Sequence, residues 1–160
     1  MRLPPRITRE WLDQNGACEG QADLFEETWP EGVLVTQKSL ALSAKAGLSL
    51  AWFAEQILSP FAYTDYLTED TPLYAACHAK SVLLYNEYEA ERVLLVTSCK
   101  QLEATMPLWE TDYRAKRDIL HAAYTAKRTA LYAEYEPKRD ALLIAALWGV
   151  YEKEAGYHEA

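Results

Sequence analysis

The apolar and polar positions between Leu102 and Ala146 repeat every eleven residues. Four residue types keep this step: Tyr113, Tyr124 and Tyr135; Lys116, Lys127 and Lys138; Arg117, Arg128 and Arg139; and Leu120, Leu131 and Leu142. Eleven residues are close to three α-helical turns, so the period predicts a long helix with a slight right-handed drift. Within each repeat, Tyr, Arg and Leu share one face of that helix. We therefore expect a buried Tyr/Leu seam with Arg at its edge and Lys towards water.

The pattern over positions 1–60 predicts a compact N-terminal helical module of four short helices. Thr8, Thr36 and Ser49 are suited to cap three of them, and apolar residues recur at steps of three and four between Ala17 and Trp29. The segment from Val33 to Val35 is compatible with a short extended segment, but it has no obvious strand to pair with, so we expect it to lead into a helix. Positions 1–6 are expected to form an extended arm.

The sequence after position 60 predicts long helices. We interpret residues 61–71 as a connecting loop, because Thr71-Pro72 suits the first turn of a helix that continues to about residue 105. Pro107 then predicts a break and Pro137 a kink, since an interior proline removes a helix hydrogen bond. Residues 72–160 should thus form a long helical hairpin or bundle, and the fold class is all-α, with long antiparallel helices that carry the eleven-residue repeat. The inward residues expected on the first long helix are Leu73, Ala76, Cys77, Leu83, Leu84, Val93, Leu94, Val96 and Leu102.

The charge is acidic and unevenly spread. The 160 residues carry a formal net charge of −8. Residues 1–112 hold 8 Lys/Arg and 17 Asp/Glu (−9), residues 113–142 hold 7 and 4 (+3), and residues 143–160 hold 1 and 3 (−2). An acidic body argues against direct nucleic-acid binding and favours a protein partner with a basic surface. No apolar run approaches the roughly 18–20 residues that span a membrane.

Candidate chemistry is sparse. Cys77-His78 is the only Cys/His adjacency. Neighbouring helical residues point about 100° apart, so these two do not form a nucleophile–base pair by themselves. The histidines His78, His121 and His158 lack metal-ligand spacing, and no glycine-rich phosphate loop is present. We expect no catalytic residue, no cofactor and no metal, and therefore no enzyme. With no signal peptide ahead of the cysteines, we expect reduced thiols and a cytoplasmic location, the host cytoplasm for a phage-encoded protein.

The chain resembles a known group of small proteins in two places. The pattern Trp11-Leu12…Ala17-Cys18-x-x-Gln21-x-x-x-Phe25-x-x-x-Trp29-Pro30-x-Gly32…Thr36, followed by Gly47-Leu48…Trp52, is similar to a module of small uncharacterised phage and prophage proteins. The repeat Tyr-x-Ala-Lys-Arg-x-x-Leu is similar to the helical repeats often appended to that module. The resemblance covers residues 7–58 and 102–146. It implies a phage or mobile-element setting, in which small acidic proteins often block host machinery such as CRISPR–Cas complexes.

These observations favour a non-enzymatic interaction protein that sterically inhibits a host complex, with anti-CRISPR activity as the most specific version. Asp65, Tyr66, Glu69 and Asp70 are the predicted partner-binding residues, because a loop would expose them together. The alternative is a phage structural or scaffolding protein that self-associates, as a homodimer for example, through the Tyr/Leu seam of its repeats. A small enzyme that uses Cys77 or His78 is the third hypothesis.

Overall fold

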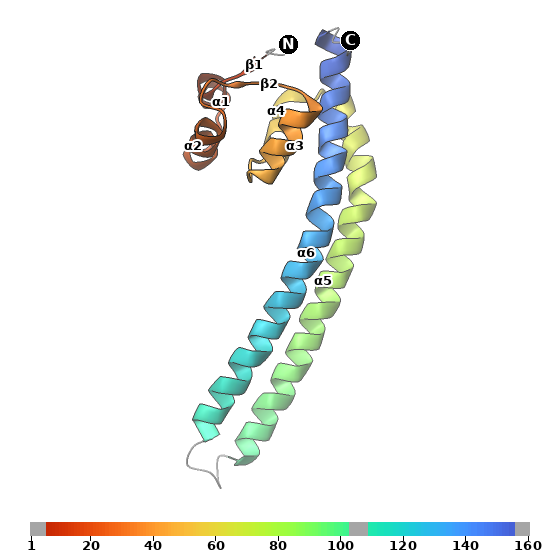
Figure 1. Ribbon diagram of the computed structural model, residues 1–160. Coiled ribbons are helices and arrows are strands. Elements are labelled where there is room, and N and C mark those ends of the chain that lie inside the picture. The colour runs from red at the N-terminus through yellow and green to blue at the C-terminus, as the bar shows by residue number, and fades with distance from the viewer. Residues whose placement is uncertain (1–5, 103–108, 156–160) are drawn as a thin grey trace. The chain divides into compact units, whose positions relative to one another are not determined.

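The computed structural model describes residues 6–102 and 109–155, and these residues form six helices and one two-stranded sheet (Figure 1). The elements are β1 (Arg6–Ile7), α1 (Arg9–Gln14), α2 (Glu19–Thr28), β2 (Val33–Leu34), α3 (Gln37–Lys45), α4 (Leu50–Ile57), α5 (Pro60–Leu102) and α6 (Trp109–Ala155). The predicted all-α fold with long helices is confirmed.

The short helices begin where the sequence places capping side chains. The hydroxyl of Thr8 accepts a hydrogen bond from the Trp11 amide, and that of Ser49 accepts one from the Trp52 amide. Thr36 and Ser39 form a reciprocal capping box at the start of α3. Such caps satisfy the amides that have no partner inside the first helical turn. The three predicted caps are therefore confirmed.

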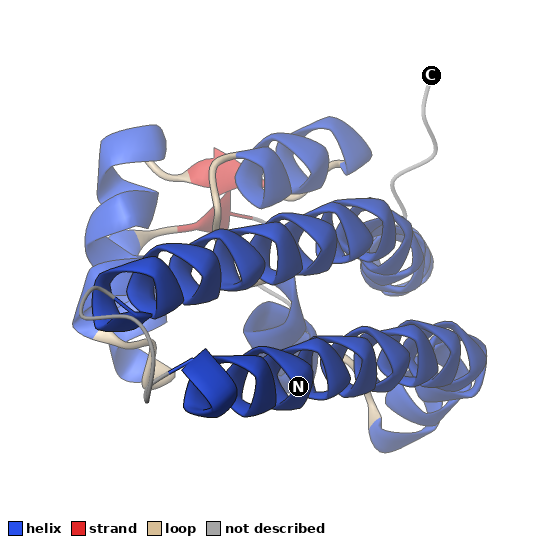
Figure 2. Ribbon diagram, turned by 90° about the horizontal axis from the view of Figure 1, so that it is seen from below, coloured by secondary structure: helices blue, strands red, loops and turns tan. Residues whose placement is uncertain are grey.

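The extended alternative is the one the structure shows at Val33–Leu34, and the expectation that no strand pairs with it is wrong, because β1 pairs with β2. Arg6 and Ile7 form β1, antiparallel to β2, with Arg6 opposite Leu34 (Figure 2, red). The Arg6 guanidinium also donates to the Glu31 carbonyl at 2.8 Å. Gly32 precedes β2 with φ +68°, and a Cβ there would lie 2.5 Å from the carbonyl oxygen of Ile7. Only glycine fits this position, because it has no Cβ and adopts positive φ without strain.

The predicted loop at residues 61–71 is also wrong, since α5 begins at Pro60 and runs through it. The Ser59 hydroxyl accepts a hydrogen bond from the Ala62 amide. Pro60 occupies the first turn, where its missing N–H costs nothing. Pro72 lies inside α5, and the helix continues past it. The Ser-Pro start twelve residues upstream is therefore the one that the chain uses.

The chain divides into two compact units. The N-terminal unit combines Met1–Thr71 with Pro137–Ala160, and the hairpin unit is Pro72–Glu136. The core of the N-terminal unit joins the short helices to the first turns of α5 and the last turns of α6; it includes Leu12, Phe25, Leu40, Leu50, Phe53, Ile57, Tyr66, Leu143, Leu147 and Tyr151. The predicted module of residues 1–60 thus shares its core with two segments outside that range.

In the hairpin unit, α5 and α6 run antiparallel, side by side (Figure 1). Tyr88 stacks on Tyr124 with ring centroids 4.8 Å apart, and Tyr74 meets Tyr135 edge-on at 6.4 Å. Both helices carry the eleven-residue step on the contact side: Leu73, Leu84 and Leu95 with Cys77, Tyr88 and Cys99 on α5, and the predicted Tyr row with Leu120 and Leu131 on α6, while Leu142 packs against the core of the N-terminal unit. All of these residues are buried or half-buried, so the predicted seam is confirmed, and it is filled from within the chain.

The predictions for Pro137 and Pro107 have different outcomes. α6 runs through Pro137, so the predicted continuation is confirmed, while the kink stays a prediction. The break predicted at Pro107 lies outside the described residues.

Candidate interaction surface

The four residues predicted to bind a partner lie on α5 rather than on a loop. Tyr66 is 8% exposed and belongs to the core of the N-terminal unit, so it cannot serve as an exposed anchor. Asp65 and Glu69 are exposed. Because they are four residues apart on a helix, they share one face. Asp70 is half-buried. The helix therefore separates a set that a loop would have presented together, and the binding role of the carboxylates stays a prediction.

The candidate catalytic groups lie on the hairpin without forming a site. Cys77 is buried in the seam, whereas His78 is exposed beside the Tyr74 ring at 5.9 Å. His121 lies against Tyr88 with centroids 6.1 Å apart. Among the described residues, no three His, Cys, Asp or Glu side chains are placed to hold a metal ion. His158 lies outside the described residues.

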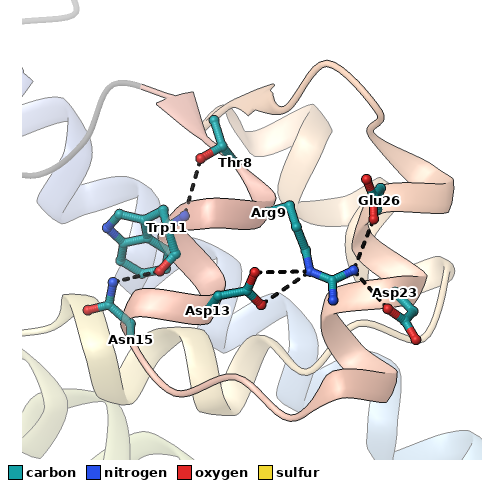
Figure 3. Close-up of polar contacts among 7 residues, drawn as sticks. All are labelled: Thr8, Arg9, Trp11, Asp13, Asn15, Asp23 and Glu26. Carbon is teal, nitrogen blue, oxygen red and sulfur yellow. Dashed lines mark hydrogen bonds and ion pairs between the residues drawn. The ribbon is translucent and has the colours of Figure 1, made fainter.

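A charged cluster joins α1 to α2 in the N-terminal unit (Figure 3). The Arg9 guanidinium donates to Asp13 at 3.1 Å, to Asp23 at 2.7 Å and to Glu26 at 2.9 Å. The hydrogen bond with Asp23 is the largest cause that raises the pKa of Arg9 above its ordinary value. One cation among three carboxylates holds two helices together and leaves an acidic surface, but it supplies no nucleophile.

The N-terminal unit also contains a cavity of about 60 Å³, lined mainly by apolar side chains such as Phe25, Leu40 and Phe53. Ligand pockets for metabolites are several hundred cubic ångströms in volume. Two polar groups at the cavity wall are already bonded, since Ser39 donates to the Leu34 carbonyl and Ser43 accepts from Trp29. We interpret the cavity as a packing space within the core.

The side of α5 that faces away from α6 carries a continuous uncharged stripe. Its residues share that side of the helix and are all exposed, and we call them the outer stripe: Ala75, Ala79, Val82, Leu83, Asn86, Ala90, Val93, Leu94 and Thr97. The exposed fractions are 62% for Leu83 and 67% for Leu94, and 43% and 57% for Val82 and Val93. Three of the large residues that we expected inside, Leu83, Val93 and Leu94, are therefore on the surface.

The outer stripe repeats with the same step as the seam. Val82-Leu83 and Val93-Leu94 are eleven residues apart, as are Leu84 and Leu95 on the opposite side. From Ala75 to Thr97 the stripe extends about 33 Å at about 1.5 Å per residue. Single exposed apolar residues are ordinary on a protein surface, but a contiguous patch is typical of an interaction site.

The hairpin segment of α6 is charged instead. Most of its basic side chains have acidic partners nearby: Arg114 pairs with Glu110 at 2.6 Å, Lys116 with Asp112 at 2.7 Å and Arg117 with Asp118 at 2.8 Å. Lys127 reaches Glu87 of α5 at 3.8 Å, and Arg128 lies 5.6 Å from the Tyr132 ring centre. The hydrogen bond with Asp112 raises the pKa of Lys116. The basic repeat is thus largely neutralised by its own neighbours.

Comparisons with protein-family models, with curated proteins and with solved structures find no match to this chain. The resemblance to phage modules therefore remains an expectation from the sequence. Among the described residues, no helix combines the length and apolar character required to cross a bilayer.

Proposed function

We propose that the protein is a non-enzymatic protein–protein interaction module that associates through the outer stripe of α5. The observation that carries the proposal is a helix with apolar residues on two opposite sides. One side is covered by α6, while Leu83 and Leu94 on the other side face water. An apolar stripe along a helix is typical of a side that packs against a neighbour, and α5 has two such stripes. Burial of the stripe against a partner removes this apolar area from water, which is favourable.

The outer stripe also limits the kind of partner. It contains no Lys or Arg. A nucleic-acid ligand requires such side chains to neutralise phosphates. Asn86 is its one polar amide, and the other residues are Ala, Val, Leu and Thr. An apolar protein surface at least as long as several helical turns is therefore the chemistry that fits.

A second proposal concerns the acidic surface: steric inhibition of a host complex, with a CRISPR–Cas or other anti-phage defence complex as the most specific target. It is supported by the net charge of −8, by the exposed carboxylates of Asp65 and Glu69, and by the sequence resemblance. A basic, nucleic-acid-binding surface would attract these carboxylates and speed encounter. The two proposals are compatible because they use different residues.

The test expresses the tagged full chain in a host cell and recovers it with its bound proteins. We compare the wild type with Leu83→Gln/Leu94→Gln, which makes the outer stripe polar, and with Ile119→Gln as the matched control. Ile119 is 70% exposed on α6. Gln is a good helix former, so none of these changes should disturb the helices. We expect the wild type and the control to form a complex, with themselves or with another protein, that the double variant loses.

The result that contradicts the first proposal is the same set of complexes for all three chains. The second proposal is tested by Asp65→Asn/Glu69→Gln and by rising salt, both of which should release a partner held by charge. A host complex that survives both changes would contradict it.

A further inference from the structure

We propose that the outer stripe is the interface between two copies of this chain, which pair antiparallel around a two-fold axis beside Asn86. This inference rests on the proposed function and names the partner. A two-fold interface brings the same patch of both subunits together, so the patch must be complementary to itself.

The outer stripe has this self-complementarity around Asn86. Four positions to either side of Asn86 lie Val82 and Ala90, and seven positions to either side lie Ala79 and Val93. In an antiparallel pair these residues lie at the same level, so each valine of one copy meets an alanine of the other. Leu83 is one position from Val82 and likewise faces Ala90 of the second copy. Leu94 is one position from Val93 and likewise faces Ala79.

Large residues that face small ones pack without voids or overlap. A parallel pair of the same helix would instead place Val82 on Val82, Leu83 on Leu83 and Ala90 on Ala90. The parallel interface would then have too much side-chain volume at the levels where two large residues meet and too little where two alanines meet. The order of large and small residues thus favours the antiparallel pair.

Asn86 lies at the centre of the stripe and would meet its own copy. A primary amide has both a donor and an acceptor, so two Asn86 side chains can hydrogen-bond to each other. A polar residue at one core position can fix the alignment of paired helices. With Asn86 on the axis, other alignments would leave a buried amide without a partner.

The area of the outer stripe is that of a small interface. The large residues Val82, Leu83, Val93 and Leu94 are 43–67% exposed. With the smaller residues between them they expose at most on the order of 700 Å² per copy, so the area that a pair buries lies below the roughly 800 Å² per partner of a standard interface and fits micromolar association.

The charges beside the outer stripe do not oppose the pair. Two of its acidic neighbours are already held within the chain, Glu87 by Lys127 at 3.8 Å and Glu89 by Arg92 at 2.8 Å. Glu91 lies on the seam side of α5, since it is eighteen residues, five helical turns, from Leu73 and lines the space between Leu84 and Leu120. Lys80, eleven residues before Glu91, shares that side, so neither charge faces the second copy.

The test is sedimentation equilibrium of the purified full chain from about 1 to about 200 µM, a range that resolves micromolar association. We expect the wild type and Ile119→Gln to approach twice the chain mass of 18.2 kDa. Leu83→Gln/Leu94→Gln and Ala90→Glu should remain at the chain mass, with the helical circular dichroism of the wild type. A wild type that is monomeric throughout, or folded variants that dimerise like it, would overturn the inference.

Orientation is tested by oxidation of single cysteines in a Cys18→Ser chain, which lacks the exposed native thiol. Asn86→Cys should form a disulfide-linked dimer, because the two positions face each other. Ala75→Cys should not, because the antiparallel arrangement places its copies far apart. A dimer linked through residue 75, or none through residue 86, overturns the inference.

The experiments distinguish a failure of the dimer inference from a failure of the proposed function. A purified chain that is monomeric, but that loses a foreign partner on Leu83→Gln/Leu94→Gln, refutes the second copy as occupant and keeps the interaction module. A wild type that forms neither kind of complex refutes both proposals.

Discussion

Truncation of Leu147 to alanine tests whether the last turns of α6 complete the core of the N-terminal unit. Leu147 has no exposed surface and belongs to the same apolar cluster as Leu12 and Phe53. Leu→Ala removes three carbons, about 2.4 kcal/mol at about 0.8 kcal/mol per buried methylene. The residual cavity adds to this, so we expect a loss of about 3 kcal/mol in the free energy of unfolding.

Urea denaturation followed by tryptophan fluorescence measures this loss. Four of the five tryptophans, Trp11, Trp29, Trp52 and Trp148, belong to the N-terminal unit, so most of the fluorescence change reports the unfolding of this unit. For a chain of this length, about 3 kcal/mol corresponds to a fall of roughly 6–12 °C in the melting temperature. The control is Leu42→Ala in the same unit, where the leucine is 43% exposed. That change should cost less than about 1 kcal/mol. A Leu147→Ala protein within about 1 kcal/mol of the wild type would refute the shared core.

Three further changes test the hairpin and the charged contacts. Tyr124→Ala removes the ring stacked on Tyr88. It should lower the free energy of unfolding of the hairpin by about 2 kcal/mol, measured by far-ultraviolet circular dichroism in urea, and no change would show that the ring contact is not stabilising. Arg9→Gln removes the guanidinium that joins α1 to α2 and should lower the melting temperature at low salt. The difference from the wild type should shrink towards about 1 M salt, where the screening length is about 3 Å, and a difference independent of salt would contradict the role of charge. Burial raises the pKa of Tyr63, and the charge and hydrogen bond of Glu55 act in the same direction. The folded state therefore keeps this proton to higher pH than the unfolded chain, so this contribution to stability is complete below the unfolded pKa of about 10 and is lost as pH rises through the folded pKa. Tyr63→Phe should flatten the loss of stability in that alkaline range, and an unchanged slope would contradict the assignment.

The features that depend on neighbouring residues could be predicted from the sequence. Thr8, Thr36 and Ser49 cap helices because their hydroxyls reach amides three positions away. The Tyr and Leu rows of α6 follow from helical geometry alone. Such features need no information about the rest of the fold.

The features that depend on distant or competing contacts could not be predicted from the sequence. β2 is a strand because Arg6 and Ile7 pair with it from more than twenty residues upstream. Residues 61–71 are helical because a Ser-Pro start precedes them, while Pro72 suggested a later start. Tyr66 is buried because it packs into the core formed with the short helices, which no local pattern records.

The outer stripe was not predicted for another reason. Because α5 is apolar on two sides, a list of its apolar residues does not separate the seam residues from those of the outer stripe. The signal lies in the spacing. Leu73, Leu84 and Leu95 keep the eleven-residue step on the seam, and Leu83 and Leu94 keep it on the opposite side. A search for the eleven-residue step along α5 as well as α6 therefore separates the seam residues from the outer-stripe residues by using the sequence alone.

The most direct test of the paired outer stripe is a distance between two copies measured by pulsed electron paramagnetic resonance. A spin label is attached to Ala75→Cys in the Cys18→Ser chain, where Cys77 and Cys99 are buried. Ala75 lies eleven positions from Asn86. The antiparallel pair therefore separates the two labelled positions by twice that interval along the helices, about 33 Å. We predict a distance distribution centred near that value. A distance below about 20 Å, as parallel helices about 10 Å apart would give, or the absence of any dipolar coupling, would contradict it.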